Sequence, residues 1–256
     1  MIPKLPNIKI KRQGQSILSL LLLVIFWQLL CMSGLVPGFM LPSPLRVSQA
    51  LISDFSLLMR HTQRTLLQAL AGLVLAVTAS FILAIAMDTS RFLKNSLSPL
   101  LLLTQTIPTI AIAPLLILWM GYGISPKITL VFLVCFFPMT ISLLEAFAQS
   151  DMDSIRLLKS MGASRRQIYR FIKLPQSLPA FFAGLKIAGS YAIIGAVIAE
   201  WLGGDAGLGV YMIRVRRSYS FDRMFAAILV TSILSITLIK IITLIEKEAM
   251  PWKKEK

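Results

Sequence analysis

Charged side chains are scarce in this sequence, and so are the residues that build metal or acid–base sites. Only 14% of the 256 residues are charged, whereas a soluble domain has roughly a quarter. The one histidine, His61, has no carboxylates grouped around it, so we expect a surface role rather than a metal ligand or catalytic base. Cys31 and Cys135 lack metal-ligand spacing and imply no disulfide framework. These shortages argue against a soluble enzyme or a metalloprotein.

Apolar residues are in excess, at 56% of the chain with a mean hydropathy of +0.78. They gather in blocks of about twenty residues, the length that crosses roughly 30 Å of hydrocarbon. The blocks cover about 16–32, 66–87, 97–120, 128–147, 179–202 and 224–245. Because backbone groups cannot stay unpaired in lipid, each block should be helical. The predicted fold is all-α, a polytopic membrane protein with six transmembrane helices in a single domain over residues 1–256.

The net charge of +15 comes from basic residues between the apolar blocks, which indicates loop charge on a membrane protein and no nucleic-acid partner. Segments assigned to the cytoplasm carry sixteen Lys and Arg, against eight in the outer segments. This bias predicts that both termini are cytoplasmic. The outer loop with Arg214, Arg216 and Arg217 runs against the rule. No small-residue cleavage site follows the first block, so we expect it to be retained as a helix.

The longest cytoplasmic loop, about residues 148–176, has the composition of two short helices. Its first part, from Asp151 to Met161, has acidic residues early and basic residues late, as the helix dipole prefers. Gly162 permits a sharp turn, and Ser164 can cap a second helix over 165–172. The Leu174-Pro175 pair is expected to end that helix. The apolar residues Ile155, Leu158 and Met161 would then be available to a partner.

The same loop resembles the signature of type I importer permeases of the ATP-binding-cassette (ABC) class. That signature has Glu-Ala-Ala, three residues, Gly, nine residues and Ile-x-Leu-Pro. This chain matches it from Gly162 to Ile172-Lys173-Leu174-Pro175, but has Arg156-Leu157-Leu158 at the Glu-Ala-Ala positions. The resemblance implies that the loop enters a cleft of an ATPase subunit. The predicted coupling residues are Met161, Gly162, Ala163, Ser164, Arg165, Arg166, Ile172, Leu174 and Pro175.

Further segments are similar to this family along most of the chain. They are Leu41–Pro44, Thr106–Pro108, Ala113–Leu115, Trp119–Gly123, Ala199–Trp201, Gly207–Gly209 and Met250–Trp252. They resemble the branch of nitrate, sulfonate, taurine and thiamine-precursor permeases, and the stretch 200–212 looks most like the pyrimidine (thiamine-precursor) members. The resemblance implies a small solute, possible identities being that pyrimidine, a sulfonate, taurine or nitrate.

The resemblance also implies the partners. We expect a homodimer in the bacterial cytoplasmic membrane, two ATPase subunits and an extracytoplasmic substrate-binding protein. The segment from Gly184 to Ser190 lacks the lysine that a phosphate-binding P-loop needs. This chain is therefore predicted to be no enzyme and to bind no cofactor or metal, while ATP and Mg²⁺ bind the partner subunit.

Five residues are candidates for the translocation pathway: Pro108, Pro114, Tyr191, Glu200 and Trp201. Glu200 is the one acid in the fifth block, and a carboxylate in a span is a functional candidate. The alternative is a structural hydrogen bond to the Gly-rich segment that follows. The prolines are either kinks or sites of exposed carbonyls, and Trp201 either anchors the chain at the interface or stacks on solute.

Small residues recur at every fourth position before Glu200, at Gly184, Ala188, Ala192 and Ala196. Such a stripe allows close helix packing, either within the chain or at a dimer interface beside the pathway. An ion-coupled secondary transporter would favour inverted repeats and buried acid or histidine relays. A membrane-embedded enzyme would need converging catalytic groups. Neither pattern is evident, so the importer permease is the leading hypothesis.

Overall fold

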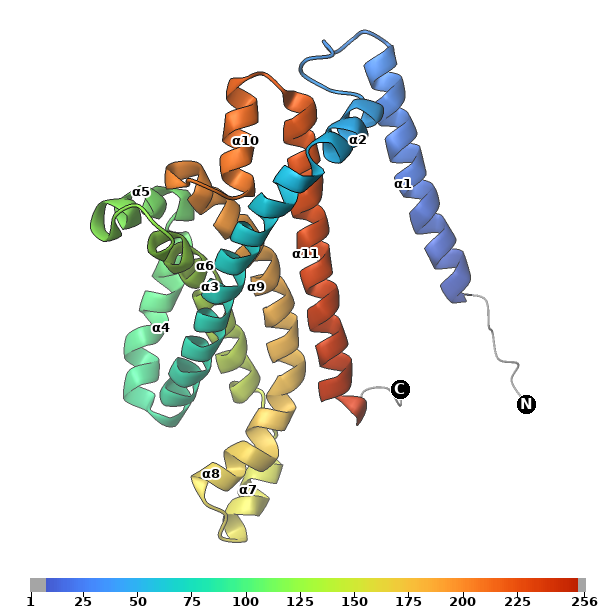
Figure 1. Cartoon of the computed structure of the whole chain (residues 1–256). Helices are drawn as coiled ribbons and strands as arrows, with labels where there is room; N and C mark the ends of the chain where they lie inside the picture. Colours follow the sequence, from blue (N-terminus) through green and yellow to red (C-terminus); the bar gives the residue numbers. More distant parts are fainter. Residues whose placement is uncertain (1–7, 253–256) are drawn as a thin grey trace, which may run out of the picture. The chain divides into compact units, whose positions relative to one another are not determined.

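The computed structural model describes residues 8–252, apart from the side chains of residues 8–17, 20 and 105. Every regular element in this range is a helix (Figure 1). The helices are α1 (Ile8–Met32), α2 (Pro44–Ser53), α3 (Phe55–Thr89), α4 (Arg91–Thr106), α5 (Thr109–Met120), α6 (Ser125–Ala148), α7 (Met152–Ser160), α8 (Arg165–Ile168), the π-helix η1 (Tyr169–Lys173), α9 (Leu174–Gly203), α10 (Leu208–Arg217) and α11 (Phe221–Ala249). Among the basic residues behind the predicted orientation, the side chains of Lys4, Lys9, Lys11, Arg12, Lys253, Lys254 and Lys256 lie outside the described part.

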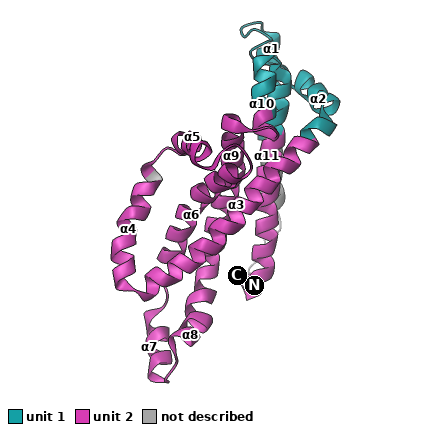
Figure 2. Cartoon of the chain, turned by 60° about the vertical axis from the view of Figure 1, so that its left-hand side comes forward, with its two compact units in different colours: residues 1–58, 211–229 teal, residues 59–210, 230–256 magenta. Residues whose placement is uncertain are grey.

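The helices divide between two compact units (Figure 2). Unit 1 comprises the described residues up to 58 and residues 211–229, and contains α1, α2, most of α10 and the start of α11. Unit 2 comprises residues 59–210 and the described residues from 230 onward, and contains most of α3, all of α4 to α9 and the rest of α11. A single domain over the whole chain stays a prediction.

Four helices in the described range are long and apolar enough to cross a membrane. They are α3, α6, the continuous helix from Arg165 to Gly203, and α11. At 1.5 Å per residue, the shortest of them, the 24-residue α6, is about 36 Å long, enough for the hydrocarbon layer. They coincide with the second, fourth, fifth and sixth predicted blocks.

The third predicted block is a broken helix. Helices α4 and α5 meet at a bend of 100°, with Pro108 as the N-cap of α5. Proline supplies no N–H and fixes φ, which favours a helix start over a helix interior. Pro99 and Pro114 instead lie inside α4 and α5. If the pair is counted as one span there are up to five, and α1 adds the shorter apolar segment Leu21–Met32. The count of six and the side of the termini stay predictions.

The core of unit 2 is the packing of α9 against α6, its most extensive helix pair. Ala188, Ala192 and Ala196 of the small-residue stripe are fully buried in the same cluster as Val131 and Cys135 of α6. The remaining stripe residue is Gly184, and a Cβ placed on it would lie only 3.0 Å from the Ser142 hydroxyl oxygen of α6. Small side chains let the two backbones approach closely. The stripe therefore packs within the chain and is covered by α6.

Candidate functional site

The 148–176 loop begins with a capped helix. The carboxylate of Asp151 accepts hydrogen bonds from the amides of Asp153 (3.1 Å) and Ser154 (3.3 Å), and from the Ser154 hydroxyl. This is the N-cap geometry that satisfies amides left over at a helix start. The hydroxyl and amide hydrogen bonds lower the pKa of the Asp151 carboxyl from its ordinary value. The helix predicted from the charge pattern is present as α7.

The turn after α7 is a Schellman motif, in which two hydrogen bonds close a helix C-terminus. The amide of Gly162 donates to the Lys159 carbonyl and that of Ala163 to the Leu158 carbonyl, both at 3.0 Å. Gly162 has φ +80°, a left-handed conformation that residues with a Cβ adopt only with strain. A Cβ there would meet nothing within 4 Å, so the requirement for glycine comes from the backbone alone.

A capping box starts the second helix, α8. The hydroxyl of Ser164 accepts from the Gln167 amide (3.4 Å), while the Gln167 side chain accepts from the Ser164 amide (2.7 Å). Two orphan amides are thus satisfied within four residues. The helix-turn-helix predicted from sequence is present up to this point.

Apolar residues of the loop form a small core of their own. Ile155, Ile168 and Ile172 are buried, and Leu158 and Ala163 pack against them. The prediction that Ile155 and Leu158 are available to a partner is therefore wrong, because each of the two helices covers the other's apolar side. Met161 at the tip remains 73% exposed. Among the other predicted coupling residues, Gly162, Ser164, Arg165 and Arg166 are exposed, Ala163, Leu174 and Pro175 are partly buried, and Ile172 is buried.

The expectation that Leu174-Pro175 ends the second helix is also wrong. The chain passes from α8 through the π-helix η1 into α9 as one 39-residue helix (Figure 1). In the π turn the Leu174 amide bonds five residues back, to the Tyr169 carbonyl. Pro175 then lies in the first turn of α9, where its missing N–H leaves no gap in the ladder. The tip of the loop is thus joined to the core helix without a break.

Asp88 on α3 fixes the base of this continuous helix. Its carboxylate accepts hydrogen bonds from the Tyr169 hydroxyl and the Lys173 ammonium, both on η1. The Lys173 and Asp88 side chains are 17% and 13% exposed, so the ion pair is largely shielded from water. Sequence reasoning missed Asp88, because it lies more than eighty residues before its partners. The pair joins the base of the loop to a second long helix of unit 2.

The far end of α9 carries a buried polar network centred on Glu200. The Glu200 side chain is only 1% exposed and accepts 2.8 Å hydrogen bonds from the Thr65 hydroxyl and the Gly209 amide. Thr65 in turn accepts from the Leu208 amide at 2.9 Å. Glu200 therefore bonds to the glycine loop, residues 203–209, as the structural alternative for this residue expects. A pathway role for Glu200 stays a prediction.

His61 belongs to the same network. It is 6% exposed, and its Nδ1 accepts a 2.9 Å hydrogen bond from the amide of Gly207. The expected surface role is therefore wrong. Gly207 has φ +132° and approaches the Glu200 carboxylate so closely that a Cβ would overlap it. The network shows why glycine is needed there, because the chain must fold back over a buried carboxylate.

Among the remaining pathway candidates, Trp201 directly follows Glu200 on α9, beside this network, and is 42% exposed. Tyr191 is 44% exposed and lines a cavity of about 550 Å³ in unit 2. Ile107 and Thr109, which flank Pro108 at the helix break, line the same cavity. Pro114, Glu200 and Trp201 are not among the described residues that line it. The structure therefore brings Tyr191 and the Pro108 break together, and their role in transport stays a prediction.

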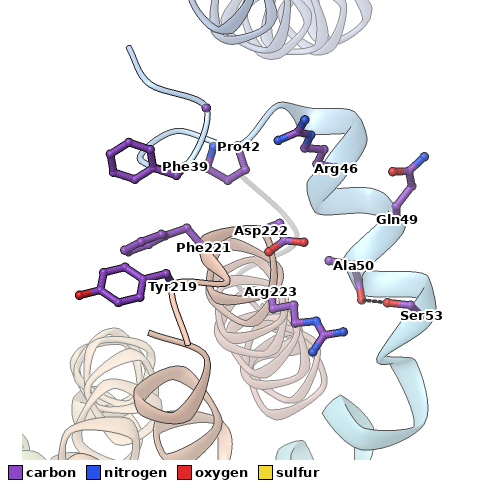
Figure 3. A pocket seen from close by; sticks show the side chains of 11 residues that line it. Phe39, Pro42, Arg46, Gln49, Ala50, Ser53, Tyr219, Phe221, Asp222 and Arg223 are labelled. Carbon is purple, nitrogen blue, oxygen red and sulfur yellow. Dashed lines mark hydrogen bonds between the residues drawn. The ribbon is translucent and has the colours of Figure 1, made fainter. Parts of the chain in front are cut away.

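Unit 1 has a cavity of its own, of about 550 Å³ (Figure 3). Aromatic side chains, including Phe39 and Phe221, form one wall, and Arg223 lies on another. Arg223 pairs with Asp54 at 3.3 Å, and Asp54 accepts a 2.6 Å hydrogen bond from the Tyr211 hydroxyl. Burial, and then the Asp54 carboxylate, raise the pKa of Tyr211. Arg223 is thus already partnered, and Arg46 and Asp222 are the other charged residues that line this cavity.

Among the described residues, no group of three or more His, Cys, Asp or Glu side chains is placed to hold a metal ion. The main feature of unit 2 is instead a connection between two distant segments. An exposed two-helix tip is joined through one continuous helix, about 58 Å long at 1.5 Å per residue, to a buried polar network at the far end.

Comparison with known proteins gives the family. Residues 48–249 match the model of the binding-protein-dependent transport system inner membrane component. The formylaminopyrimidine transport permease protein ThiX of Halalkalibacterium halodurans is 33% identical over 96% of this chain and 99% of its own length. The riboflavin transport system permease protein RibX of Chloroflexus aurantiacus is 34% identical over 92% of this chain and 88% of its own.

A solved structure supports the fold independently. The permease fold of an inward-facing MetNI methionine ABC transporter superposes with a TM-score of 0.69, covering 77% of this chain and 98% of the other at 17% identity. The chain belongs to the inner membrane components of binding-protein-dependent transport systems, as a multi-pass permease of an ABC importer for a small solute.

Proposed function

We propose that this chain forms the translocation pathway as a homodimer, with ATP hydrolysis in two separate ATPase subunits and solute delivered by an extracytoplasmic binding protein. The observation that carries the proposal is the exposed tip of the 148–176 loop on a helix continuous with α9. Met161 to Arg166 would contact the ATPase. Their displacement as the ATPase closes on ATP would move α9, and Asp88 would carry part of that movement to α3.

The solute we propose is a thiamine-precursor pyrimidine. The supporting observations are the resemblance of residues 200–212 to pyrimidine permeases and the identity to ThiX across nearly the whole chain. The similar identity to RibX keeps riboflavin as an alternative, and taurine, sulfonate or nitrate would use the same machinery. Exposed Arg214, Arg216 and Arg217 on α10 offer a basic surface that suits an acidic face of the binding protein.

Co-purification tests this proposal. The tagged chain is extracted from its native membrane in a mild detergent, and the proteins that accompany it in near-equal amount are identified. We expect an ATPase subunit in one-to-one ratio and a complex mass that fits two permease chains. A clean single-chain preparation, with uptake that follows a proton or sodium gradient and ignores ATP, would contradict the proposal and favour a secondary transporter.

A further inference from the structure

A second cavity of unit 2, of about 520 Å³, lies at the far end of α9 from the 148–176 loop. Its volume is in the range of small-molecule sites. Residues of α3, of the turn before α6, of α6 itself and of the glycine loop line it. The residues that matter to its chemistry are Arg64, Gln68, Tyr122, Lys127 and Asp205.

Gln68 gives this cavity an unpaired acceptor. Its side chain is 3% exposed, and its Oε1 has no hydrogen-bond partner among the described residues. Buried amide oxygens almost always have a partner, since leaving one unpaired is unfavourable. Because Gln68 lines the cavity, a ligand that brings an N–H or O–H donor close to this buried oxygen would supply its missing partner.

Lys127 supplies donors to the same cavity. Its side chain is 4% exposed, and its ammonium pairs with Asp205 at 3.6 Å, beyond ordinary hydrogen-bond distance. An ammonium has three N–H donors, so this contact leaves donor capacity for an acceptor on a ligand. Asp205 is 96% exposed and open to water.

Tyr122 completes the chemistry of the cavity. Its side chain is 84% exposed, and an exposed phenol ring beside a polar floor can stack on a flat ligand. The cavity thus combines the Gln68 acceptor, the Lys127 donor and the aromatic face of Tyr122, with Arg64 as a second cation and the exposed carboxylate of Asp205 also on its wall.

We propose that this cavity is a reception site for the solute, and that it takes a flat nitrogen heterocycle with an N–H donor beside an acceptor on one edge. This inference rests on the proposed importer function. Gln68 accepts the ligand N–H, Lys127 donates to the neighbouring ring nitrogen or carbonyl, and Tyr122 stacks on the ring. An aminopyrimidine and the flavin ring both carry such an edge, and these ring systems occur in the solutes for which the ThiX and RibX permeases are named.

The test is equilibrium dialysis on the intact permease–ATPase complex in nanodiscs, without the binding protein. The probes are a radiolabelled formylaminopyrimidine, riboflavin, and methanesulfonate as an acceptor-only anion. We expect one of the heterocycles to bind and methanesulfonate to fail. Gln68→Leu should weaken heterocycle binding about tenfold or more, as expected for the loss of a hydrogen bond. Gln68→Glu, which keeps an acceptor, should retain binding.

Two further variants make the test specific. Gln63→Leu makes the same change at an exposed position of α3 and should leave binding as in the wild type. Tyr122→Ala, at an exposed residue that does not disturb the core, should weaken binding by about threefold or more. This variant keeps the test decisive if Gln68→Leu fails to fold.

The inference is overturned if neither heterocycle binds the wild-type complex, if Tyr122→Ala and a folded Gln68→Leu bind as well as the wild type, or if methanesulfonate binds in place of the heterocycles. ATP hydrolysis by the same preparations reports on the proposed function separately. An active complex that fails the dialysis test keeps the importer function and loses only this site.

Discussion

The continuous helix from Arg165 to Gly203 meets a turn at each end, and the two turns are stabilised by different kinds of contact. At the 148–176 loop the hydrogen bonds that form the two helix caps and the turn join residues two to five apart, and the tip is exposed. At the glycine loop they join His61 to Gly207 and Thr65 to Leu208, 146 and 143 residues apart, around a buried carboxylate. The tip of the first end is therefore a local structure, and the bonds of Asp88 and Gln176 reach only its base. The second end holds distant segments of unit 2 together, so we expect it to govern stability.

The largest effect should come from Gly162→Val at the first end. A β-branched residue is unfavourable at φ +80° by about 1–2 kcal/mol, so the turn should change its geometry while the protein stays folded. We expect ATP-driven uptake in proteoliposomes to fall to background, with membrane insertion and thermal stability close to the wild type.

Two matched variants control for that change. Gly162→Asn should retain most uptake, because asparagine tolerates left-handed conformations. Gly38→Val places the same side chain at a glycine without a positive φ, where a Cβ would meet only the Arg46 guanidinium at 3.8 Å, and should be active. Normal uptake by Gly162→Val would show that the loop does not couple to an ATPase.

The second effect should be loss of stability from Glu200→Ala at the other end. Removing the carboxylate leaves the Gly209 amide and the Thr65 hydroxyl without their acceptor, at about 1–3 kcal/mol for each buried group. We expect a clear fall in melting temperature of the detergent-solubilised protein, and a smaller fall for Glu200→Gln, which keeps one acceptor.

Glu145→Ala, at an exposed acid of α6, is the control and should change stability by no more than about 0.5 kcal/mol. If Glu200→Ala melts like the wild type but no longer transports, the contrast between the two ends fails. Glu200 would then act in the pathway.

The contrast also explains what the sequence can predict. The acidic start and basic end of α7, the Gly162 turn and the Ser164 cap are local patterns, and the structure has all three. The apolar blocks are local in the same sense, and each lies within one helix except the third, which is broken at Pro108. The long-range pairs are different. Nothing near His61 in the sequence indicates that its partner is Gly207, and the surface role expected from its isolation was wrong.

Two errors within the loop have a similar origin. Leu174-Pro175 predicts a helix end because proline removes an amide, but the π turn before it makes that amide unnecessary. The sequence of α7 alone predicts that Ile155 is free for a partner, whereas α8 and η1 cover it. In both cases a neighbouring segment, the π turn before Pro175 or the helices that pack on Ile155, changes the outcome that the local pattern alone predicts.

A smaller effect is expected for Ser164→Ala, which removes the acceptor of the capping box. Loss of such a cap costs about 1 kcal/mol locally. We expect faster hydrogen exchange in α8, unchanged exchange around Glu200, and partial loss of uptake. Ser164→Asp, another good cap, should restore protection in α8. Exchange that rises equally at both ends of α9 would show that the loop is not a separate local unit.

The smallest effect should come from protonation of Asp151. Hydrogen bonds from Ser154 and Asp153 lower its pKa, so the cap stabilises α7 above the ordinary carboxyl pKa of about 3.9. That stabilisation is lost as the pH falls through the lower pKa of the folded protein. Below about pH 3.9, hydrogen exchange corrected for its intrinsic pH dependence should increase in α7. Asp151→Asn should remove this pH response while keeping a cap. Protection of α7 that does not change with pH in the wild type would show that the carboxylate does not hold the helix start, and the first end of α9 would then depend on its apolar core alone.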